Sequence, residues 1–519
     1  MATNDKPLPQ IPVTGKSSDV ATEVLDKLAE CGPLLFVQSG VLVRLRGDEA
    51  EPLSKDALVH ELNCRFDFTV SGKGGVTVVD PPPRVVADIL VRVAFGLPTL
   101  SGVVRTPFFT SAGRLVRDPG FHKDCGVVLL PDPDLRVAPV SDKPTPEEVE
   151  TAKRLLMRDL LGRFPFVSQT DIAHTVGCAL QPFVREMIDG PRPLFAFDAS
   201  RPGSGKGALV HSLTIIATGR EAEVQPGVEK DELRKRITSI LLSGAPQAFF
   251  DNATRRVDSG SFAALLTSKV WRDRILGVTK MSVALPNRTQ WFISGNNIRF
   301  SDEMLRRTVR VRLEPQVENP EERKFGEFLL PGWAKAHRAE LVWACLTLVQ
   351  NWIAKGGVPF TEIALGSFES WAKATGGILR AAGIEGFLQD RARFRQEADE
   401  RGANWRAFIA AWAQDYGTAV VTAKELYDLA KDTIADEMGD GNSDRSQQTR
   451  LGLLLGERRG WITGEWKLMA AKGSDDKSRP RNGWKLEPAE IEKEELKGAE
   501  EEEIDEGDPW TNGANDHVD

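Results

Sequence analysis

The chain has 519 residues, enough for three or four domains at about 100–200 residues each. Its composition, 41% hydrophobic and 27% charged, is ordinary for a globular protein. The formal net charge of −8 argues against a surface coated in basic charge for nucleic acid, unless that charge is unevenly distributed along the chain.

Signals for membranes, export and metals are weak. No apolar run approaches the ~20 residues that cross a bilayer, and the polar N-terminus lacks the apolar core of a secretory signal. The five cysteines lie far apart without a CxxC pair, and the six histidines are scattered. We therefore expect a cytoplasmic protein without disulfides, zinc or a membrane partner.

The first part of the chain predicts three segments. Residues 1–20 are polar and are expected to be disordered. Residues 21–145 alternate helical and strand-like stretches, which predicts an α+β N-terminal domain, although no catalytic cluster is recognisable there. Residues 146–191 open with a proline and acidic residues and continue in helical patterns, so a helical linker is expected.

The remainder predicts an α/β domain followed by two smaller regions and a tail. Between residues 192 and 318 apolar strands alternate with helices, which indicates a parallel α/β sheet. Residues 319–400 are helical, and residues 401–486 give helices and then short strands. Residues 487–519 form an acidic tail that is expected to be disordered.

The strongest local signal is the glycine-rich segment 200–207, SRPGSGKG, between a predicted strand and a predicted helix. Backbone N–H groups of such a loop turn inward around phosphate oxygens, and the helix N-terminus adds partial positive charge. Lys206 would reach the β- and γ-phosphates. The residues expected to bind the nucleotide are Pro202, Gly203, Ser204, Gly205, Lys206, Gly207 and Ala208.

This loop departs from the GxxxxGK[ST] pattern at both ends. Ser200 replaces the first glycine, and Gly207 replaces the hydroxyl residue that normally holds Mg²⁺. Triphosphate binding is therefore better supported than magnesium coordination, and a plain glycine turn before a helix is the alternative. PGSGKG also resembles the loop of adenylate kinases, but in that family the loop lies close to the N-terminus.

Two further predicted strands end in polar residues. In QAFFDN (247–252) Asp251 would hold the Mg²⁺ shell as in a Walker B strand, and Asn252 stands where ATPases often place a glutamate. The next strand ends at Asn296 and Asn297, where an amide can sense the γ-phosphate, with Asn296 preferred. Ligands bind beyond the carboxyl ends of strands in open α/β sheets, so these residues are expected at one edge. Taken singly, each end is also an ordinary turn signal.

A pair of arginines follows in the segment 302–311, DEMLRRTVRV. Asp302 caps a short helix that ends in Arg306 and Arg307. An arginine displayed there suits a finger inserted at the γ-phosphate of a neighbouring subunit, where it stabilises transition-state charge. A surface pair favoured by the helix dipole is the alternative.

Together these motifs resemble an AAA+ ATPase core. More narrowly, FDASRPGSGKG, FFDNA, FISGNN and LRRTVRVRL resemble the helicase module of phage and mobile-element replication proteins, similar to superfamily-3 helicases and virus primase–helicases. The resemblance covers about residues 145–486. It implies a helical lid over 319–400, ATP and Mg²⁺ as cofactors, and a hexameric ring moving on DNA. A primase or an origin-binding protein is a further candidate partner.

DNA contacts are expected in two places. Family helicases project a basic hairpin into the ring channel, and Lys280 in the segment 274–284 is the candidate, with an ordinary edge-strand lysine as the alternative. Residues 401–486 read as a winged helix whose basic loop carries Arg479 and Arg481 as candidate DNA contacts. Winged helices also pack against protein partners.

The leading hypothesis is an ATP-dependent DNA helicase or translocase that replicates a phage or mobile element. An AAA+ initiator, or a defence or transposition switch that binds DNA without unwinding, is the first alternative. A nucleotide kinase fits the Asn-ended strand and the arginine pair poorly. A structural adaptor with a degenerate ATP site is favoured by Gly207 and Asn252.

The charge is unevenly distributed. Residues 487–519 contain 14 acidic residues and 2 lysines, a net charge of −12, which leaves residues 1–486 with a net charge of +4. The acidity therefore belongs to a solvated tail, and the rest of the chain is mildly basic. The acidic total no longer counts against a DNA-binding motor.

Overall fold

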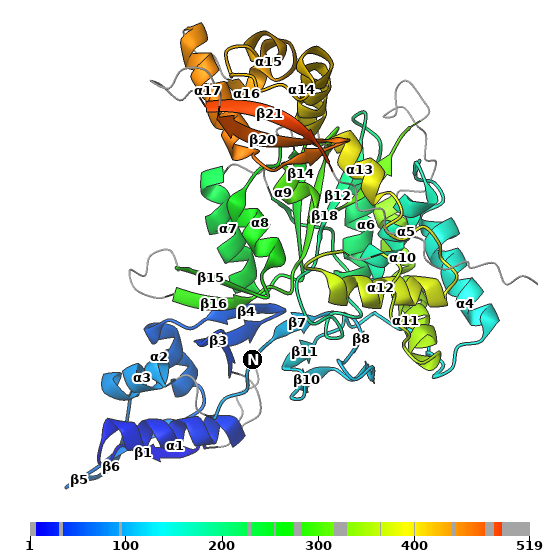
Figure 1. Cartoon of the computed structure of the whole chain (residues 1–519). Coiled ribbons are helices and arrows are strands. Elements are labelled where there is room, and N and C mark those ends of the chain that lie inside the picture. Colours follow the sequence, from blue (N-terminus) through cyan, green and yellow to red (C-terminus); the bar gives the residue numbers. More distant parts are fainter. Residues whose placement is uncertain are drawn as a thin grey trace, which may run out of the picture. The chain divides into compact units, whose positions relative to one another are not determined.

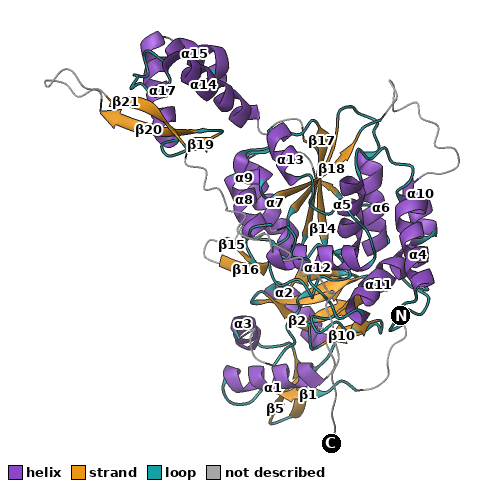
Figure 2. Cartoon of the chain, turned by 45° about the vertical axis from the view of Figure 1, so that its right-hand side comes forward, coloured by secondary structure: helices purple, strands orange, loops and turns teal. Residues whose placement is uncertain are grey.

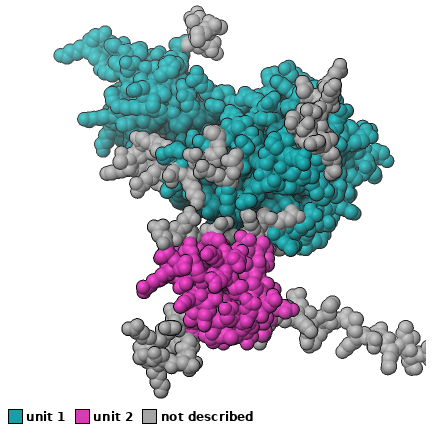
Figure 3. All heavy atoms as spheres, turned by 90° about the horizontal axis from the view of Figure 1, so that it is seen from above, with its two compact units in different colours: residues 1–399 teal, residues 400–519 magenta. Residues whose placement is uncertain are grey.

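The computed structural model describes residues 7–30, 35–92, 96–225, 230–253, 256–274, 282–315, 330–363, 365–398, 400–438, 443–472 and 482–489. The chain divides into two compact units, residues 1–399 and 400–519 (Figure 3). Lys280, Arg479 and Arg481 and the tail from residue 490 onward lie outside the described residues. Within those ranges, no helix has the length and apolar character needed to cross a membrane.

The first part of unit 1 is built from short elements (Figure 1). These are β1 (Gln10–Pro12), α1 (Ser17–Glu30), β2 (Leu35–Gln38), β3 (Val41–Arg46), β4 (Glu49–Pro52), α2 (Lys55–Asn63), β5 (Asp67–Gly72), β6 (Gly75–Val79), α3 (Pro83–Val91), β7 (Gly102–Val104), β8 (Phe108–Phe109), β9 (Leu115–Val116), β10 (Gly120–His122) and β11 (Val127–Leu129). They form small sheets ordered β1-β5-β6, β2-β3-β4, β10-β11-β7 and β8-β9. The expectation of disorder is wrong for residues 10–20, because Ile11 and Val20 are buried in one apolar core that offsets the entropy of ordering.

A five-stranded parallel sheet lies at the centre of unit 1, with helices on both faces (Figure 2). The elements from the first to the last strand of the sheet are β12 (Leu194–Ala199), α6 (Lys206–Thr218), β13 (Val224–Gln225), α7 (Lys230–Ser243), β14 (Gln247–Ala253), α8 (Gly260–Thr267), β15 (Val270–Arg274), β16 (Ser282–Pro286), β17 (Gln290–Asn296), α9 (Asp302–Leu305) and β18 (Thr308–Leu313). This is the α/β class that the alternation of strands and helices predicted.

The order of the sheet decides which strand ends meet. The strands lie in the order β13-β14-β17-β12-β18, and every pairing is parallel. Strand β17 therefore lies between β12, which leads into the glycine-rich loop, and β14, which carries Asp251. Strands β12 and β17 are almost fully buried, as expected for a sheet that is covered on both faces.

Further helices of unit 1 pack around the sheet and its helices, with α5 against β18 and with α10 and α11 against α6. They are α4 (Pro146–Lys153), the π-helix η1 (Arg154–Leu160), α5 (Gln169–Leu180), α10 (Leu330–Ala336), α11 (Arg338–Ala354), α12 (Glu369–Ala381) and α13 (Arg391–Ala398). The segment 146–191 is not a linker as expected, because Leu156, Leu160 and Val176 are buried in the same apolar core as β12. Burial of these helix faces makes the segment an integral part of the sheet domain.

Unit 2 has its own core and topology. Its elements are α14 (Glu400–Tyr416), α15 (Tyr427–Thr433), α16 (Ala435–Met438), α17 (Asp444–Glu457), β19 (Ile462–Thr463), β20 (Trp466–Lys472) and β21 (Asn482–Pro488). The strands form an antiparallel sheet, and Trp405, Phe408 and Trp412 are buried in the core. Helices followed by strands agree with the expected order of elements, while the winged-helix assignment stays a prediction.

Candidate functional site

The glycine-rich loop joins β12 to α6. Its path depends on two glycines, because Gly203 (φ 72°) and Gly205 (φ 94°) have left-handed backbone conformations. A Cβ atom at Gly205 would also lie 3.4 Å from the ring of Phe164. Within the described part of the chain, no side chain caps the N-terminus of α6, so its first backbone N–H groups are available to an anion.

Lys206, the first residue of α6, is the buried cation of this loop, with an exposed fraction of 9%. Its Nζ donates hydrogen bonds to Asn296 Oδ1 at 2.8 Å and to Ser204 Oγ at 2.9 Å. Burial lowers the pKa of Lys206, and the nearby carboxylates of Asp198 and Asp251 partly oppose that shift. The ammonium group therefore lies where the polar ends of β12, β14 and β17 converge.

Asp251 lies where β14 leaves its regular pairing with β17. Its carboxylate accepts a hydrogen bond from the Ser294 hydroxyl and one at 2.9 Å from the Asn252 backbone N–H. The pairing register shifts between Phe250 and Ala253, and Asn252 has a left-handed φ of 57°. The bulge thus leaves Asn252 exposed while Asp251 is held in place by two donors.

The two asparagines at the end of β17 have different positions. Asn296 contacts Lys206, whereas Asn297 (φ 49°) donates its backbone N–H to Ala199 O at 2.8 Å and closes the turn against β12. The sequence did not single out Ser294, which holds Asp251. The signal for it was the period of two along a strand, which places Ser294 and Asn296 on one face.

A second charged pair was also missed. Arg312 of β18 forms an ion pair with Asp198 of β12 and lies 3.4 Å from Glu314, whose carboxylate accepts a hydrogen bond from the Ser200 hydroxyl. Asp198 and Arg312 are paired residues in the parallel register of β12 and β18. Only this long-range register brings them together, next to the glycine-rich loop.

Arg306 and Arg307 lie at the opposite edge of the sheet from the loop. They precede Thr308, the first residue of β18, whereas the loop lies beyond the end at Leu313. Five steps of about 3.3 Å along a strand separate those ends by about 17 Å. Arg306 is exposed, whereas Arg307 Nη2 lies 3.2 Å from the Glu303 carboxylate. The structure therefore does not bring either arginine to the loop of its own chain.

The carboxyl edge of the sheet offers one ligand suited to Mg²⁺. Asp251 offers a carboxylate that two donors hold in place, and Mg²⁺ is usually bound by one or two carboxylates together with phosphate oxygens and water. Gly207 adds no oxygen, although a Cβ atom there would meet nothing within 4 Å. No cluster of three or more acidic, histidine or cysteine side chains suited to a metal occurs within the described ranges.

Comparison with known proteins gives structural neighbours only. No family model matches the sequence, and no curated protein matches it. The chain is similar to the apo A form of the NrS-1 C-terminal region, with 12% identity and a TM-score of 0.40 over 89% of this chain and 99% of that chain. It is also similar to JCV helicase, with 11% identity and a TM-score of 0.24 over 52% of this chain and 66% of that chain. Likenesses at this level assign neither a family nor an activity.

Proposed function

We propose that this chain is a P-loop nucleoside triphosphatase. The observation that carries the proposal is the convergence of Lys206, Asp251 and Asn296 at one sheet edge, beside an uncapped helix N-terminus. The loop N–H groups and Lys206 would bind the β- and γ-phosphates of ATP, and Asp251 would bind Mg²⁺, which neutralises charge on the transferring phosphate.

Within that class, the proposed activity is that of an AAA+ DNA helicase or translocase in the replication of a phage or mobile element. Support comes from the resemblance of the four motifs and from the position of Arg306. Because about 17 Å of strand, estimated from strand geometry, separates the end of β18 next to this arginine from the end beside the loop, a role at the γ-phosphate requires a second subunit. A ring, proposed to be a hexamer bound to DNA, supplies that subunit.

The amide of Asn296 has a defined part in this proposal. Its Oδ1 accepts from Lys206, so its Nδ2 hydrogens are directed away from the ammonium group. They would donate to the γ-phosphate or to the attacking water. The amide would thereby link the state of the phosphate to the lysine that binds it.

Lys206→Ala tests the nucleotide site. Loss of one charge-assisted hydrogen bond, worth about 1.5–3 kcal/mol, is expected to weaken ATP binding about 10- to 150-fold. Titration with a fluorescent ATP analogue measures the affinity, and displacement of a strand from forked DNA measures unwinding. ATP affinity and unwinding should fall together, whereas Lys55→Ala, at an exposed position on α2, should leave both unchanged. Full ATP binding by Lys206→Ala would refute the proposed site.

A DNA-binding AAA+ initiator or switch is the second candidate, and Asn252 favours it. An amide is a poor general base, and no carboxylate follows Asp251 directly in the sequence. Slow ATP hydrolysis would then set how long the chain stays bound to DNA, and it would not drive unwinding. ATP-dependent binding of DNA without strand displacement by the wild-type chain would support the switch and reject the helicase.

A further inference from the structure

A second polar site lies at the amino edge of the sheet. A cavity of about 170 Å³ is lined by the first residues of β14 and β17, Gln247 and Gln290, and by Thr218 at the end of α6. Lys206 and Thr218 are the two ends of a 13-residue helix, so about 20 Å of helix separates this cavity from the glycine-rich loop. It is therefore distinct from the candidate nucleotide site.

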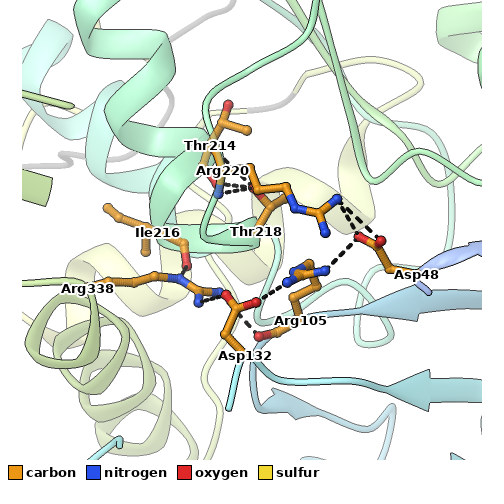
Figure 4. Close-up of polar contacts among 8 residues, drawn as sticks. All are labelled: Asp48, Arg105, Asp132, Thr214, Ile216, Thr218, Arg220 and Arg338. Carbon is orange, nitrogen blue, oxygen red and sulfur yellow. Dashed lines mark hydrogen bonds and ion pairs between the residues drawn. The ribbon is translucent and has the colours of Figure 1, made fainter. Parts of the chain in front are cut away.

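On one wall of the cavity the arginines are paired with aspartates (Figure 4). Arg105 forms ion pairs with Asp48 and Asp132, and Arg220 forms an ion pair with Asp48 at 3.2 Å. Asp132 also binds Arg338, which in turn donates to the Ile216 carbonyl near the end of α6. Three guanidinium groups and two carboxylates alternate here, so each of these arginines has a carboxylate partner and the excess is a single positive charge.

The other wall has more cations than anions. Arg288 lies 2.7 Å from the Glu186 carboxylate, and Arg185 lies 3.6 Å from the same carboxylate. Arg192 donates only to the Arg185 carbonyl, at 2.7 Å, among the contacts of the described residues. Three guanidinium groups thus share one carboxylate. The other carboxylates that line the cavity, Glu49, Glu221 and Glu223, are exposed to water, which screens their charge.

Several buried polar atoms on this wall have no hydrogen-bond partner in the described part of the chain. They are Nε and Nη1 of Arg185, Nε of Arg192, both amide atoms of Gln181, and Oε1 of Gln247. Arg185 is 8% exposed, Arg192 is 3% exposed and Gln181 is 2% exposed. A buried charge or amide without a partner is costly, so such a group in a native fold calls for a ligand or water.

The pKa values of the two buried arginines agree with this shortage of partners. Burial lowers the pKa of Arg192 to about 9 and that of Arg185 to about 10, and neighbouring arginines add to both shifts. Both groups are still charged at pH 7, because that pH lies below both values. An anion inside the cavity would raise both pKa values again.

We propose that this cavity binds a phosphate dianion, held by Arg185 and Arg192. Two unbalanced guanidinium groups match a double negative charge, and their planar donors suit phosphate oxygens. The cavity is larger than the ~10–15 Å³ that one water needs, so it has room for a small phosphate compound. It is too small for a macromolecule. The free amide of Gln181 would bond a phosphate oxygen or the group esterified to it.

The test uses the full chain and potassium phosphate, with potassium chloride at equal ionic strength as reference. Titration calorimetry at pH 7 should give saturable phosphate binding by the wild-type chain and by Lys206→Ala, which disables the loop. Arg192→Met should weaken binding at least tenfold, and its melting temperature without phosphate should stay equal or rise, because an unpaired buried charge is removed. Arg114→Met removes an exposed arginine elsewhere and should leave the affinity unchanged.

Three results would overturn the proposal: equal affinity in Arg192→Met, loss of binding in Lys206→Ala alone, or an equal heat with chloride. If Arg192→Met does not fold, Arg288→Gln, at a position 35% exposed, replaces it and should weaken phosphate binding several-fold. Unchanged affinity there would likewise reject the site. Adenosine monophosphate distinguishes the two sources of the phosphate group. If it competes with phosphate for the cavity, the ligand is a phosphomonoester, and if it does not compete, the ligand is free phosphate.

Discussion

The two edges of the parallel sheet carry charge in different ways. At the carboxyl edge, Lys206 and Arg312 lie beside Asp198 and Asp251, so cations and carboxylates are nearly matched. At the amino edge, buried arginines outnumber their carboxylate partners. A balanced edge is suited to a nucleotide that arrives with its own metal cation, because the metal compensates the added phosphate charge. A cationic edge is suited to a bare anion.

Arg306→Ala should have the largest effect, which is on the rate of hydrolysis. The variant tests whether a residue at the amino edge of one subunit acts on the nucleotide at the carboxyl edge of another. If Arg306 serves a neighbouring subunit, hydrolysis falls about 10³-fold while ATP affinity is unchanged, because an arginine finger acts in the transition state. Steady-state ATPase assays and nucleotide titration measure the two quantities. Arg307→Ala should have a smaller effect, since Glu303 already pairs with that side chain.

Mixing variants gives the control for this prediction. A mixture of Arg306→Ala and Lys206→Ala should recover part of the hydrolysis, because some interfaces then combine an intact loop with an intact arginine. Absence of any recovery, or a parallel loss of ATP affinity in Arg306→Ala, would contradict a role between subunits.

Asp251→Asn should slow magnesium-dependent hydrolysis about 10²-fold, the usual cost of removing one group that stabilises the transition state. The amide keeps the oxygen that accepts from Ser294, so the fold should be retained. Phosphate binding at the amino edge should not change, which calorimetry can check. Asp26→Asn, at an exposed position on α1, is the matched control. A loss of phosphate binding in Asp251→Asn would remove the distinction between the edges.

Gly207→Ser should have the smallest effect on stability. The added side chain has open space and replaces a helical glycine, so the free energy of unfolding should rise by about 0.5 kcal/mol in urea denaturation. The hydroxyl should also lower the Mg²⁺ concentration needed for half-maximal hydrolysis. Gly207→Ala is the control, because it changes the stability of the helix without adding a hydroxyl. Identical magnesium dependence in the two variants would argue against a metal next to residue 207.

Local patterns predicted the α/β sheet and the group around the loop. The glycines and Lys206 form a contiguous motif, and strand periodicity placed polar residues at strand ends. Asn296 was preferred over Asn297 from the sequence, and the structure places it beside Lys206. Each of these motifs can be recognised from residues close together in the chain, although the contact between Lys206 and Asn296 joins residues that are far apart.

Features that depend on distant residues could not be predicted. The pairing of Asp198 with Arg312 requires the register of two strands that are separated by five others in the sequence. Arg185 and Arg192 looked like ordinary charged residues, and only the packing of β14, β17 and α6 around them shows that they are buried. The burial of Ile11 likewise depends on helices that follow it.

Strand β18 has one more consequence. It carries Arg312 beside the glycine-rich loop at one end and is preceded by the exposed Arg306 at the other. Strand β18 is mostly buried and is paired with β12 along its whole length, so a small movement at Asp198 on ATP hydrolysis would be passed along the strand toward Arg306. In the proposed ring, β18 would then link the nucleotide site of one subunit to the arginine that this subunit presents to its neighbour. This link would set the order in which successive subunits hydrolyse ATP.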